Sequence, residues 1–409
     1  MSYAISRRAA LSTPLVALAA RPARADIRPI KIGMLTDLTA TNSAGTGKGS
    51  VTGATLAIED FMAANPDIKV ELVVADFQAK ADIALAMGRN WFDREGVDVI
   101  VNVQNSAAAL AIADMVREKD KVALFTSPAS SDLTGKACSP NHIHWVYDTW
   151  SLGHSTGTAL VEGGGDSWFF IAADYTFGRS LAGDTAGFVT KAGGKVLGTV
   201  YTPFPETTDF SSFLIQAKAS GAKVIGLANS GDNTVNCIKQ AQEFGIAKSG
   251  IRLASLLLTI PDVHATGIAT AGGLVLSEAF YWDMNDDTRS WSKRFGERMN
   301  GIMPNMMQAG DYSAVTHYLK TVQKLGVAKA RESGRTVVDA MKAMPTQDPV
   351  YGTGAIRPDG RKIHPMYLFQ VKTPGESRYP WDYYKLLQTI PAETAFRPLN
   401  EGNCKFVVT

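Results

Sequence analysis

The sequence has few cysteines, no excess of charge of one sign and no long hydrophobic run, and each shortage excludes a class of protein. Only three of its 409 residues are cysteine, which excludes a disulfide-rich framework. After residue 25, no stretch reaches the roughly 18 uninterrupted apolar positions that span a bilayer. With 45% hydrophobic and 20% charged residues, the chain can bury a full core, fits two or three domains and is not intrinsically disordered.

The balance of charge argues against a nucleic-acid partner. The whole chain holds 41 basic and 39 acidic residues. Residues 1–25 contain four Arg and no acid, so the rest of the chain carries 37 basic and 39 acidic side chains, a net charge of −2. A slightly acidic protein is a poor electrostatic match for a phosphate backbone. We therefore expect no binding of DNA or RNA.

Residues 1–25 have the layout of a cleavable secretory signal. Arg7 and Arg8 precede an apolar run over residues 9–20, and the small residues Ala23 and Ala25 provide a cleavage site. The run is too short to cross a membrane. Paired arginines also fit the twin-arginine export route. A cytoplasmic amphipathic leader is the alternative, but the sequence favours an exported protein that starts at residue 26.

The three cysteines lie in different settings. Cys237 belongs to a helical pattern of apolar residues in NTVNCIKQAQEFG, which predicts a buried thiol. Cys138 and Cys404 lie in polar, loop-like stretches, GKACSPN and EGNCKF. We predict that these two form a disulfide that ties the C-terminal tail to the body of the protein.

From Ile30 onward, short apolar runs alternate with longer helical patterns, which predicts β-α-β units and parallel sheets. The first array has expected strands at IKIGML, KVELVVAD, VDVIVNV and VALFTS, and helices over 49–64, 79–93 and 107–118. A helix over about 150–162 leads to a second array. Its expected strands are WFFIAA, KVLGTVY, KVIGLANS, IRLASLLL and GGLVLSEAF, and its helices cover 178–192, 209–219 and 231–245. The fold class is α/β, with two similar arrays in tandem.

Further elements follow the second array. Helical patterns cover 288–300, 309–326 and 332–344, and short strands are expected near 354–357 and 365–371. These late elements must complete one array or the other. The chain is therefore expected to cross between two lobes more than once.

Glycines after the first strand do not form a nucleotide-binding motif. A phosphate-binding loop needs a glycine where Asn42 stands, and Lys48 is followed by Gly49 instead of Ser or Thr. The glycines at 45, 47 and 49 also lack the spacing of a dinucleotide-binding turn. The loop still places backbone N–H groups at a helix N-terminus, where an anion is favoured.

Motifs for metal binding and catalysis are also incomplete. His142, His144 and His154 cluster in the sequence, but no Cys, Asp or Glu shares the spacing of a zinc site, so ordinary hinge or surface histidines are favoured over a metal. No Gly-x-Ser-x-Gly turn and no activated cysteine is present. We expect neither enzymatic activity nor a cofactor.

Polar residues gather where four expected strands end and helices begin. They lie in VNVQNSAAA, LFTSPASSD, AADYTFG and GLANSGDN, two blocks from each array. Open α/β sheets bind their ligands at the carboxyl ends of strands. Helix capping explains single residues such as Ser130 and Asp232, but four clusters from two arrays favour a binding cleft between two lobes.

These blocks resemble the substrate-binding proteins of ABC importers, and among them the receptor family for branched-chain amino acids (leucine, isoleucine and valine). The resemblance runs through IKIGMLTDLTATNSAGTGKGSVTGATLAIEDF, VIVNVQNSAAALAIADM, LFTSPASSDLTG, FFIAADYTFGRSL and KVIGLANSGDNTVNCIKQA. It implies a type I periplasmic-binding-protein fold, in which two Rossmann-like lobes with parallel-sheet cores are joined by a three-crossover hinge. It also implies a monomer in the periplasm that closes over a ligand and delivers it to ABC permease subunits.

On this basis the chain divides into a leader, two lobes and a tail. The expected ranges are 1–25 for the signal peptide, 26–147 plus 282–352 for lobe 1, 148–281 plus 353–380 for lobe 2, and 381–409 for a tail pinned to lobe 1.

The resemblance also implies roles for residues of the first lobe. Asn105 and Ser106 match positions after the third strand that hold the ligand carboxylate. Ser127, Ala129 and Ser130 match a loop that holds it through backbone N–H and hydroxyl groups. A carboxylate bound by several neutral donors needs no arginine.

In the second lobe, Tyr175 or Phe177 matches the aromatic residue that covers the ligand, and residues 229–232, with Asn229 and Asp232, match the next loop across the cleft. In the first loop, the small set Asn42-Ser43-Ala44-Gly45, with Ser43 as a candidate contact, replaces a bulky aromatic residue. The ligand is therefore expected to be larger than a branched-chain amino acid.

The late second-lobe loop departs from the family. Amino-acid receptors usually offer an acid there for the α-ammonium, whereas ASLLLTIPD is apolar until Asp262. An unpaired buried ammonium is costly, which favours an aromatic carboxylate such as a benzoate derivative, with Asp232 accepting a hydrogen bond from a ring hydroxyl. The blocks ACSPNHIHWVYDTW and SEAFYWDMNDDTR resemble the aromatic-acid-binding subgroup.

Three alternatives remain. One is a receptor of the same family for branched-chain or other amino acids. Another is a domain that senses amides or amino acids and regulates their metabolism, which usually has no leader. A secreted hydrolase would need an activated nucleophile or a metal.

Overall fold

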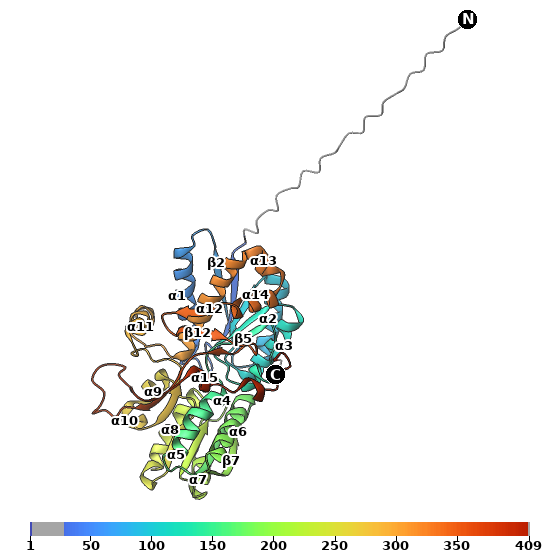
Figure 1. The fold of residues 1–409 in the computed structure, drawn as a ribbon. Helices are drawn as coiled ribbons and strands as arrows, with labels where there is room; N and C mark the ends of the chain where they lie inside the picture. Colours follow the sequence, from blue (N-terminus) through green and yellow to red (C-terminus); the bar gives the residue numbers. More distant parts are fainter. Residues whose placement is uncertain (2–27, 408–409) are drawn as a thin grey trace.

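Two lobes, each built around its own β-sheet, make up the protein (Figure 1). The computed structural model describes Met1 and residues 28–407, so the predicted leader, apart from Met1, lies outside the described residues. None of the helices that it describes is long and apolar enough to cross a membrane.

The first lobe contains a parallel five-stranded sheet in the order β2-β1-β3-β4-β5. Its strands are β1 (Ile30–Thr36), β2 (Val70–Asp76), β3 (Val99–Asn102), β4 (Val122–Phe125) and β5 (His142–His144). Every residue of β3, β4 and β5 is buried, as in parallel strands that are covered on both faces. The helices between them are α1 (Gly47–Ala64), α2 (Ala81–Asn90), which continues as a π-helical turn over Trp91–Glu95, and α3 (Ser106–Glu118).

The second lobe contains a mixed seven-stranded sheet in the order β15-β14-β10-β9-β8-β6-β7. Its parallel strands are β6 (Ser167–Ala173), β7 (Lys195–Thr202), β8 (Val224–Ala228), β9 (Arg252–Ser255) and β10 (Val275–Glu278). Two antiparallel strands, β14 (Met366–Val371) and β15 (Tyr384–Ile390), extend one edge. The helices are α4 (Thr149–Leu152), α5 (Thr158–Glu162), α6 (Thr176–Lys191), α7 (Ser211–Ala219), α8 (Asp232–Glu243), α9 (Ile260–Thr266) and α10 (Ile268–Ala271).

After β10 the chain returns to the first lobe. This part comprises α11 (Asp286–Arg298), α12 (Met306–Leu325), α13 (Val327–Glu332), α14 (Gly334–Lys342) and a small sheet of β11 (Thr346–Asp348), β12 (Gly352–Ile356) and β13 (Lys362–Ile363). The expected lobe ranges need correction here. Residues 353–363 pair within the small sheet and reach β5 through the His144–Arg361 bridge, whereas 384–390 belong to the second sheet.

Close packing of α1 against α12 fixes one wall of the first lobe. A Cβ at Gly53 of α1 would lie 2.3 Å from the backbone oxygen of Gln308 in α12. Only glycine permits this approach of the two backbones. It brings Ser50 of α1 and Asp311 of α12 into the same buried region beneath the strand ends.

A buried ion pair joins the first and third crossovers between the lobes. Arg361 Nη1 lies 3.2 Å from Asp148 Oδ2 and donates to the Tyr147 carbonyl oxygen at 3.3 Å. Asp148 also caps α4 by accepting a hydrogen bond from the Ser151 N–H. Because neither charge has access to water, breaking this pair would leave a buried charge uncompensated.

The C-terminal tail returns to the first lobe after β15 and passes through α15 (Ala392–Ala395). Cys138 and Cys404 form a disulfide across 266 positions of sequence. Arg397 donates to the Ser131 carbonyl oxygen at 2.8 Å beside it. The third cysteine, Cys237, is buried in α8 as a free thiol.

We predict that removing the disulfide with Cys138→Ser/Cys404→Ser lowers the free energy of unfolding by about 2–5 kcal/mol, because the link restricts a very long loop of the unfolded chain. Urea denaturation followed by circular dichroism measures the change. Cys237→Ala is the control. It keeps the disulfide, so a reductant should still lower the midpoint of its urea denaturation. An unchanged midpoint in the double variant would contradict this prediction.

Candidate functional site

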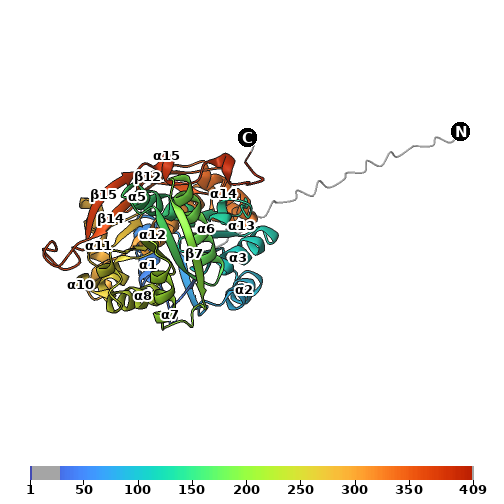
Figure 2. The same cartoon turned by 90° about the horizontal axis from the view of Figure 1, so that it is seen from below.

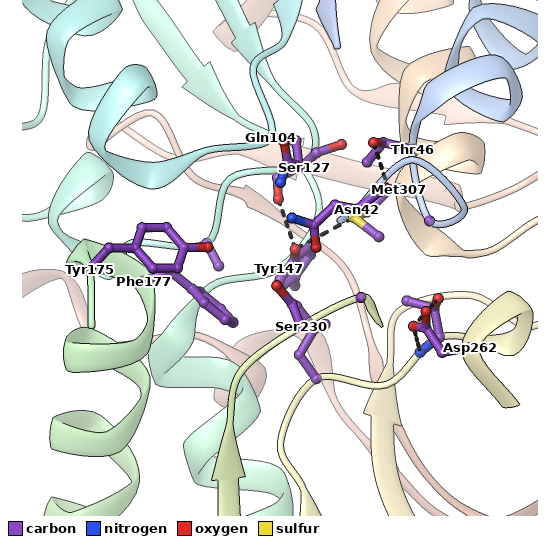
Figure 3. A pocket seen from close by; sticks show the side chains of 15 residues that line it. Asn42, Thr46, Gln104, Ser127, Tyr147, Tyr175, Phe177, Ser230, Asp262 and Met307 are labelled. Carbon is purple, nitrogen blue, oxygen red and sulfur yellow. Dashed lines mark hydrogen bonds between the residues drawn. The ribbon is translucent and has the colours of Figure 1, made fainter. Parts of the chain in front are cut away.

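A cleft lies where strand ends of the two lobes face each other (Figure 3). Its empty space, including open solvent at the mouth, is about 420 Å³. The first lobe contributes Asn42, Gly45, Thr46, Gln104, Ser127, Ala129, Tyr147 and Met307. The second lobe contributes Tyr175, Phe177, Ser230, Gly231, Leu257, Thr259 and Asp262.

Hydrogen bonds to Asp37 shape the loop after β1. Its carboxylate accepts from the Ala40 N–H at 2.7 Å and from the Asn42 N–H at 3.0 Å. Burial raises the pKa of Asp37, and these hydrogen bonds partly oppose that effect. The fold of this loop turns Asn42 toward the centre of the cleft (Figure 3).

Backbone conformation places Gln104 after β3. Asn102 and Val103 have positive φ angles of 77° and 57°. A positive φ is rare for a β-branched residue such as Val103, so the surrounding structure must hold this conformation. The turn aims Gln104 at the cleft beside Ser127 (Figure 3).

Neutral polar groups gather at this first-lobe end of the cleft. The Ser127 hydroxyl accepts a hydrogen bond from Asn102 Nδ2 at 2.9 Å, and the Ser127 carbonyl oxygen accepts one from the Tyr147 hydroxyl at 2.7 Å. Asn42 Nδ2 and Gln104 Oε1 are buried without a hydrogen-bond partner. Buried polar groups are usually paired, so these side chains are suited to hydrogen-bond a ligand.

Aromatic and apolar side chains form the rest of the wall. The rings of Tyr175 and Phe177 lie 5.8 Å apart, and Tyr175 stacks on Phe204 at 4.3 Å. Leu257 and Met307 add apolar surface. Burial raises the pKa of Tyr147 and of Tyr175, so both hydroxyls stay neutral at physiological pH.

One carboxylate, Asp262, faces this cleft from α9. Its Oδ2 accepts hydrogen bonds from the Thr259 N–H at 2.9 Å, as part of the capping box of the helix, and from the Thr259 hydroxyl at 2.7 Å. No interaction among the described residues engages Oδ1. Burial raises the pKa of Asp262. No Lys, Arg or His among residues 28–407 lines the cleft, so this carboxylate has no cationic partner there.

Backbone groups of the two lobes meet at the mouth of the cleft. The Asp232 N–H donates to the Thr41 carbonyl oxygen at 3.0 Å. Gly231 has a positive φ of 57°, and a Cβ there would lie 2.2 Å from the same oxygen. Glycine at this position therefore lets the lobes close.

Comparison with known proteins identifies the family. The family model described as periplasmic binding protein matches residues 29–376. The chain belongs to this family.

Similar solved structures come from several bacteria. A periplasmic binding protein from Burkholderia mallei is 44% identical, with 92% of this chain and 99% of that chain covered and a TM-score of 0.88. A branched chain amino acid ABC transporter periplasmic ligand-binding protein from Burkholderia xenovorans LB400 is 38% identical, with the same coverages and a TM-score of 0.80. A solute-binding protein of an ABC transporter from R. palustris, solved in complex with benzoate, is 19% identical over 89% of this chain and 97% of its own, with a TM-score of 0.79, and shows the shared fold. A search of the curated proteins found no match.

The type I fold and its two lobes are thus confirmed, and this periplasmic binding protein is of the ABC-transporter type. Family and relatives are binding proteins of transport systems, not enzymes. No group of three or more His, Cys, Asp or Glu within residues 28–407 is arranged to hold a metal. His142 and His144 are buried in β5 rather than exposed, and each ring hydrogen-bonds a backbone carbonyl oxygen at 2.7 Å.

Four of the ten predicted contacts line the cleft of this binding protein: Ser127, Ala129, Tyr175 and Phe177. The other six lie beside it. Asn105 caps α3 by accepting from the Ala108 N–H, and Ser106 accepts from the N–H groups of Ala129 and Ser130. Ser130 caps the short helical turn over Ser131–Thr134. Asn229 accepts from the Thr234 hydroxyl. Ser43 belongs to the turn after β1, and Asp232 contributes its backbone N–H at the mouth.

Several lining residues were not predicted as contacts. Gln104 and Ser230 belong to the polar strand-end clusters, and Asn42 belongs to the small set of residues in the first loop, so position alone could have selected them. Asp262 was visible as the first acid after an apolar stretch. Tyr147 and Met307 reach the cleft from the crossover after β5 and from α12, and no local pattern marks them.

We predict that Gly231→Ala keeps the lobes apart, because the added methyl group meets the Thr41 carbonyl oxygen. Small-angle X-ray scattering should give a larger radius of gyration than for the wild type. Ligand binding should weaken about tenfold, since affinity falls with the fraction of closed molecules. Gly250→Ala is the matched control: it has a similar positive φ of 81° but no atom within 4 Å of the new Cβ. Scattering identical to that of the wild type would refute this interpretation.

Proposed function

We propose that this protein is the solute receptor of an ABC importer, which captures a small organic carboxylate in the cleft and delivers it to the permease subunits. One observation carries the proposal: neutral donors and unpaired amides at one end of an interlobe cleft whose other walls are aromatic and apolar. We also propose that residues 1–25 direct export to the periplasm, by the general or the twin-arginine route, and that the mature protein is a monomer.

The first candidate ligand is a hydroxylated aromatic acid such as a benzoate derivative. Its carboxylate would accept hydrogen bonds from the Ser127 hydroxyl and from Asn42 Nδ2. Its ring would lie against Tyr175 and Phe177. The ring hydroxyl would donate to Asp262, in the role that the sequence assigned to Asp232, because Asp262 is the acid that lines the cleft. The related fold from R. palustris accommodates benzoate.

An amino acid is the second candidate, and Asp262 is the observation that favours it. The late second-lobe loop, ASLLLTIPD, is apolar until Asp262, which disfavoured an amino acid. In the structure, however, this loop brings the buried Asp262 carboxylate, with a free Oδ1, to the cleft. An ammonium group would pair with it. The name of the 38% identical relative, a branched chain amino acid receptor, also supports this ligand.

Asp262→Asn separates the two candidates. If a hydroxylated aromatic acid is the ligand, we predict that the variant keeps its affinity for benzoate and binds 4-hydroxybenzoate about tenfold more weakly, because a charge-assisted hydrogen bond is lost. If an amino acid is the ligand, leucine and valine lose binding. Isothermal titration calorimetry gives the dissociation constants, and Asp286→Asn, whose side chain is 99% exposed, is the control.

A thermal-shift screen of residues 26–409 precedes the titrations. A ligand present at about 100 times its dissociation constant adds about 2.7 kcal/mol to the free energy of unfolding and raises Tm accordingly. The panel is benzoate, 4-hydroxybenzoate, leucine, valine and, as neutral analogue, benzamide. A protein that no carboxylate stabilises would overturn the proposed function.

A further inference from the structure

Directly behind Ser127, a carboxylate is buried without a cation. Asp311 of α12 has no exposed surface. Its oxygens accept hydrogen bonds from the Thr126 hydroxyl at 2.5 Å and from Asn102 Nδ2 at 3.0 and 3.2 Å, and the Ser50 hydroxyl also donates to it. All of these partners are neutral.

Asn102 connects this carboxylate to the cleft. The Nδ2 group that donates to Asp311 also donates to the Ser127 hydroxyl at 2.9 Å. Since an ionised carboxylate only accepts hydrogen bonds, Asp311 fixes the orientation of the Asn102 amide. Asn102 Nδ2 also lies 3.0 Å from the Ser50 hydroxyl oxygen. When one of its two N–H groups points to Asp311 and the other to Ser127, Ser127 accepts from Asn102 and keeps its own proton for an acceptor in the cleft. Only two hydrogen bonds separate Asp311 from the hydroxyl that would contact a ligand anion.

Desolvation makes this carboxyl group easy to protonate. Burial raises the pKa of Asp311 to about 7, although its three neutral donors oppose the shift. The elements packed against it contribute Ser50, Asn102 and Thr126, none of which carries a charge. Burial raises the pKa of the nearby Tyr351 hydroxyl, and the charges of Asp348, Glu278 and Asp311 raise it further. Within the described chain, no Lys or Arg pairs with Asp311.

We propose that Asp311 is a positioning residue that takes up one proton from solvent when a carboxylate binds at Ser127. The inference rests on the proposed function. A second negative charge near Ser127 repels the ionised Asp311 through a region that excludes water, where screening is weak. Protonation removes that repulsion. The neutral carboxyl still accepts from Asn102 through one oxygen and donates from the other to the hydroxyl of Ser50 or Thr126, so the orientation of Ser127 is kept.

Coupling of this kind gives the affinity a definite pH dependence. Anion binding favours the protonated form of Asp311, so the affinity for a carboxylate should fall as the pH rises above 7. Three other acids near the cleft must be separated from this effect. Burial raises the pKa of Asp262 and of Asp232, and raises that of Glu278, which accepts from the Tyr384 hydroxyl, to about 8.

Calorimetry in two buffers of different ionisation enthalpy tests the proposal, because it counts the protons taken up on binding. The probe is whichever of benzoate, 4-hydroxybenzoate, leucine or valine binds the wild type best. We expect uptake of about 0.6 proton at pH 8, and a dissociation constant that rises about tenfold between pH 6.5 and 8.5. Asp311→Asn should abolish the uptake and flatten the pH profile. Glu278→Gln, the matched buried carboxylate, should keep both.

The outcomes separate the inference from the proposed function. Carboxylate binding without proton uptake in the wild type overturns the inference and leaves the proposed function standing, even if Asp311→Asn does not fold. Uptake that persists in Asp311→Asn, or that disappears in Glu278→Gln alone, also overturns it. If no carboxylate binds at any pH, both the proposed function and the inference fail. A melting curve for each variant without ligand verifies that it is folded.

Discussion

The binding cleft depends on a constraint of the backbone: the parallel strands of both sheets end at the gap between the lobes. The loops that follow β1, β3 and β4 meet those that follow β6, β8 and β9. Asn42 and Asp262 line the same cleft although 220 positions of sequence separate them. Parallel strands leave their polar loops at one edge of the sheet. Two such edges facing each other create a site that neither lobe provides alone. The two lobes must therefore close on each other for the complete site to form.

Desolvation governs the chemistry inside the closed cleft. The polar side-chain groups there are hydroxyls, amides and the Asp262 carboxyl, and no basic side chain of residues 28–407 belongs to the lining. Each unpaired polar atom, such as Asn42 Nδ2, costs free energy until a ligand satisfies it. Exclusion of water also disfavours the charged form of the Asp262 carboxyl and so raises its pKa. Affinity thus comes from pairing groups that the fold has already removed from water.

The sequence predicted the two lobes and the strand-end position of the site, because both follow from local hydrophobic periodicity. Ser127 and Tyr175 lie in the strand-end clusters, and the family resemblance selected them as candidate contacts. Asn105 and Asn229 lie at equivalent strand ends, but Asn105 caps α3 and donates to the Ala79 carbonyl oxygen, and Asn229 accepts from the Thr234 hydroxyl. Composition does not separate such residues from ligand contacts. Tyr147 and Met307 could not be predicted, since tertiary packing alone brings them to the cleft. The strand at 384–390 was assigned to the tail, and its sequence carries little strand signal because it lies at the edge of the sheet with its five central residues exposed.

If the cleft binds its ligand as proposed, the arrangement of charge also determines which ligands it rejects. One end offers neutral donors that suit a single carboxylate, with Asp311 behind them, and the other end presents Asp262. A dicarboxylate or a phosphate ester would place a second negative charge where no cation compensates it and where a carboxylate already lies. A hydroxyl or ammonium group at that position instead gives Asp262 a donor. Specificity therefore rests as much on the cost of the wrong charge as on contacts with the right one.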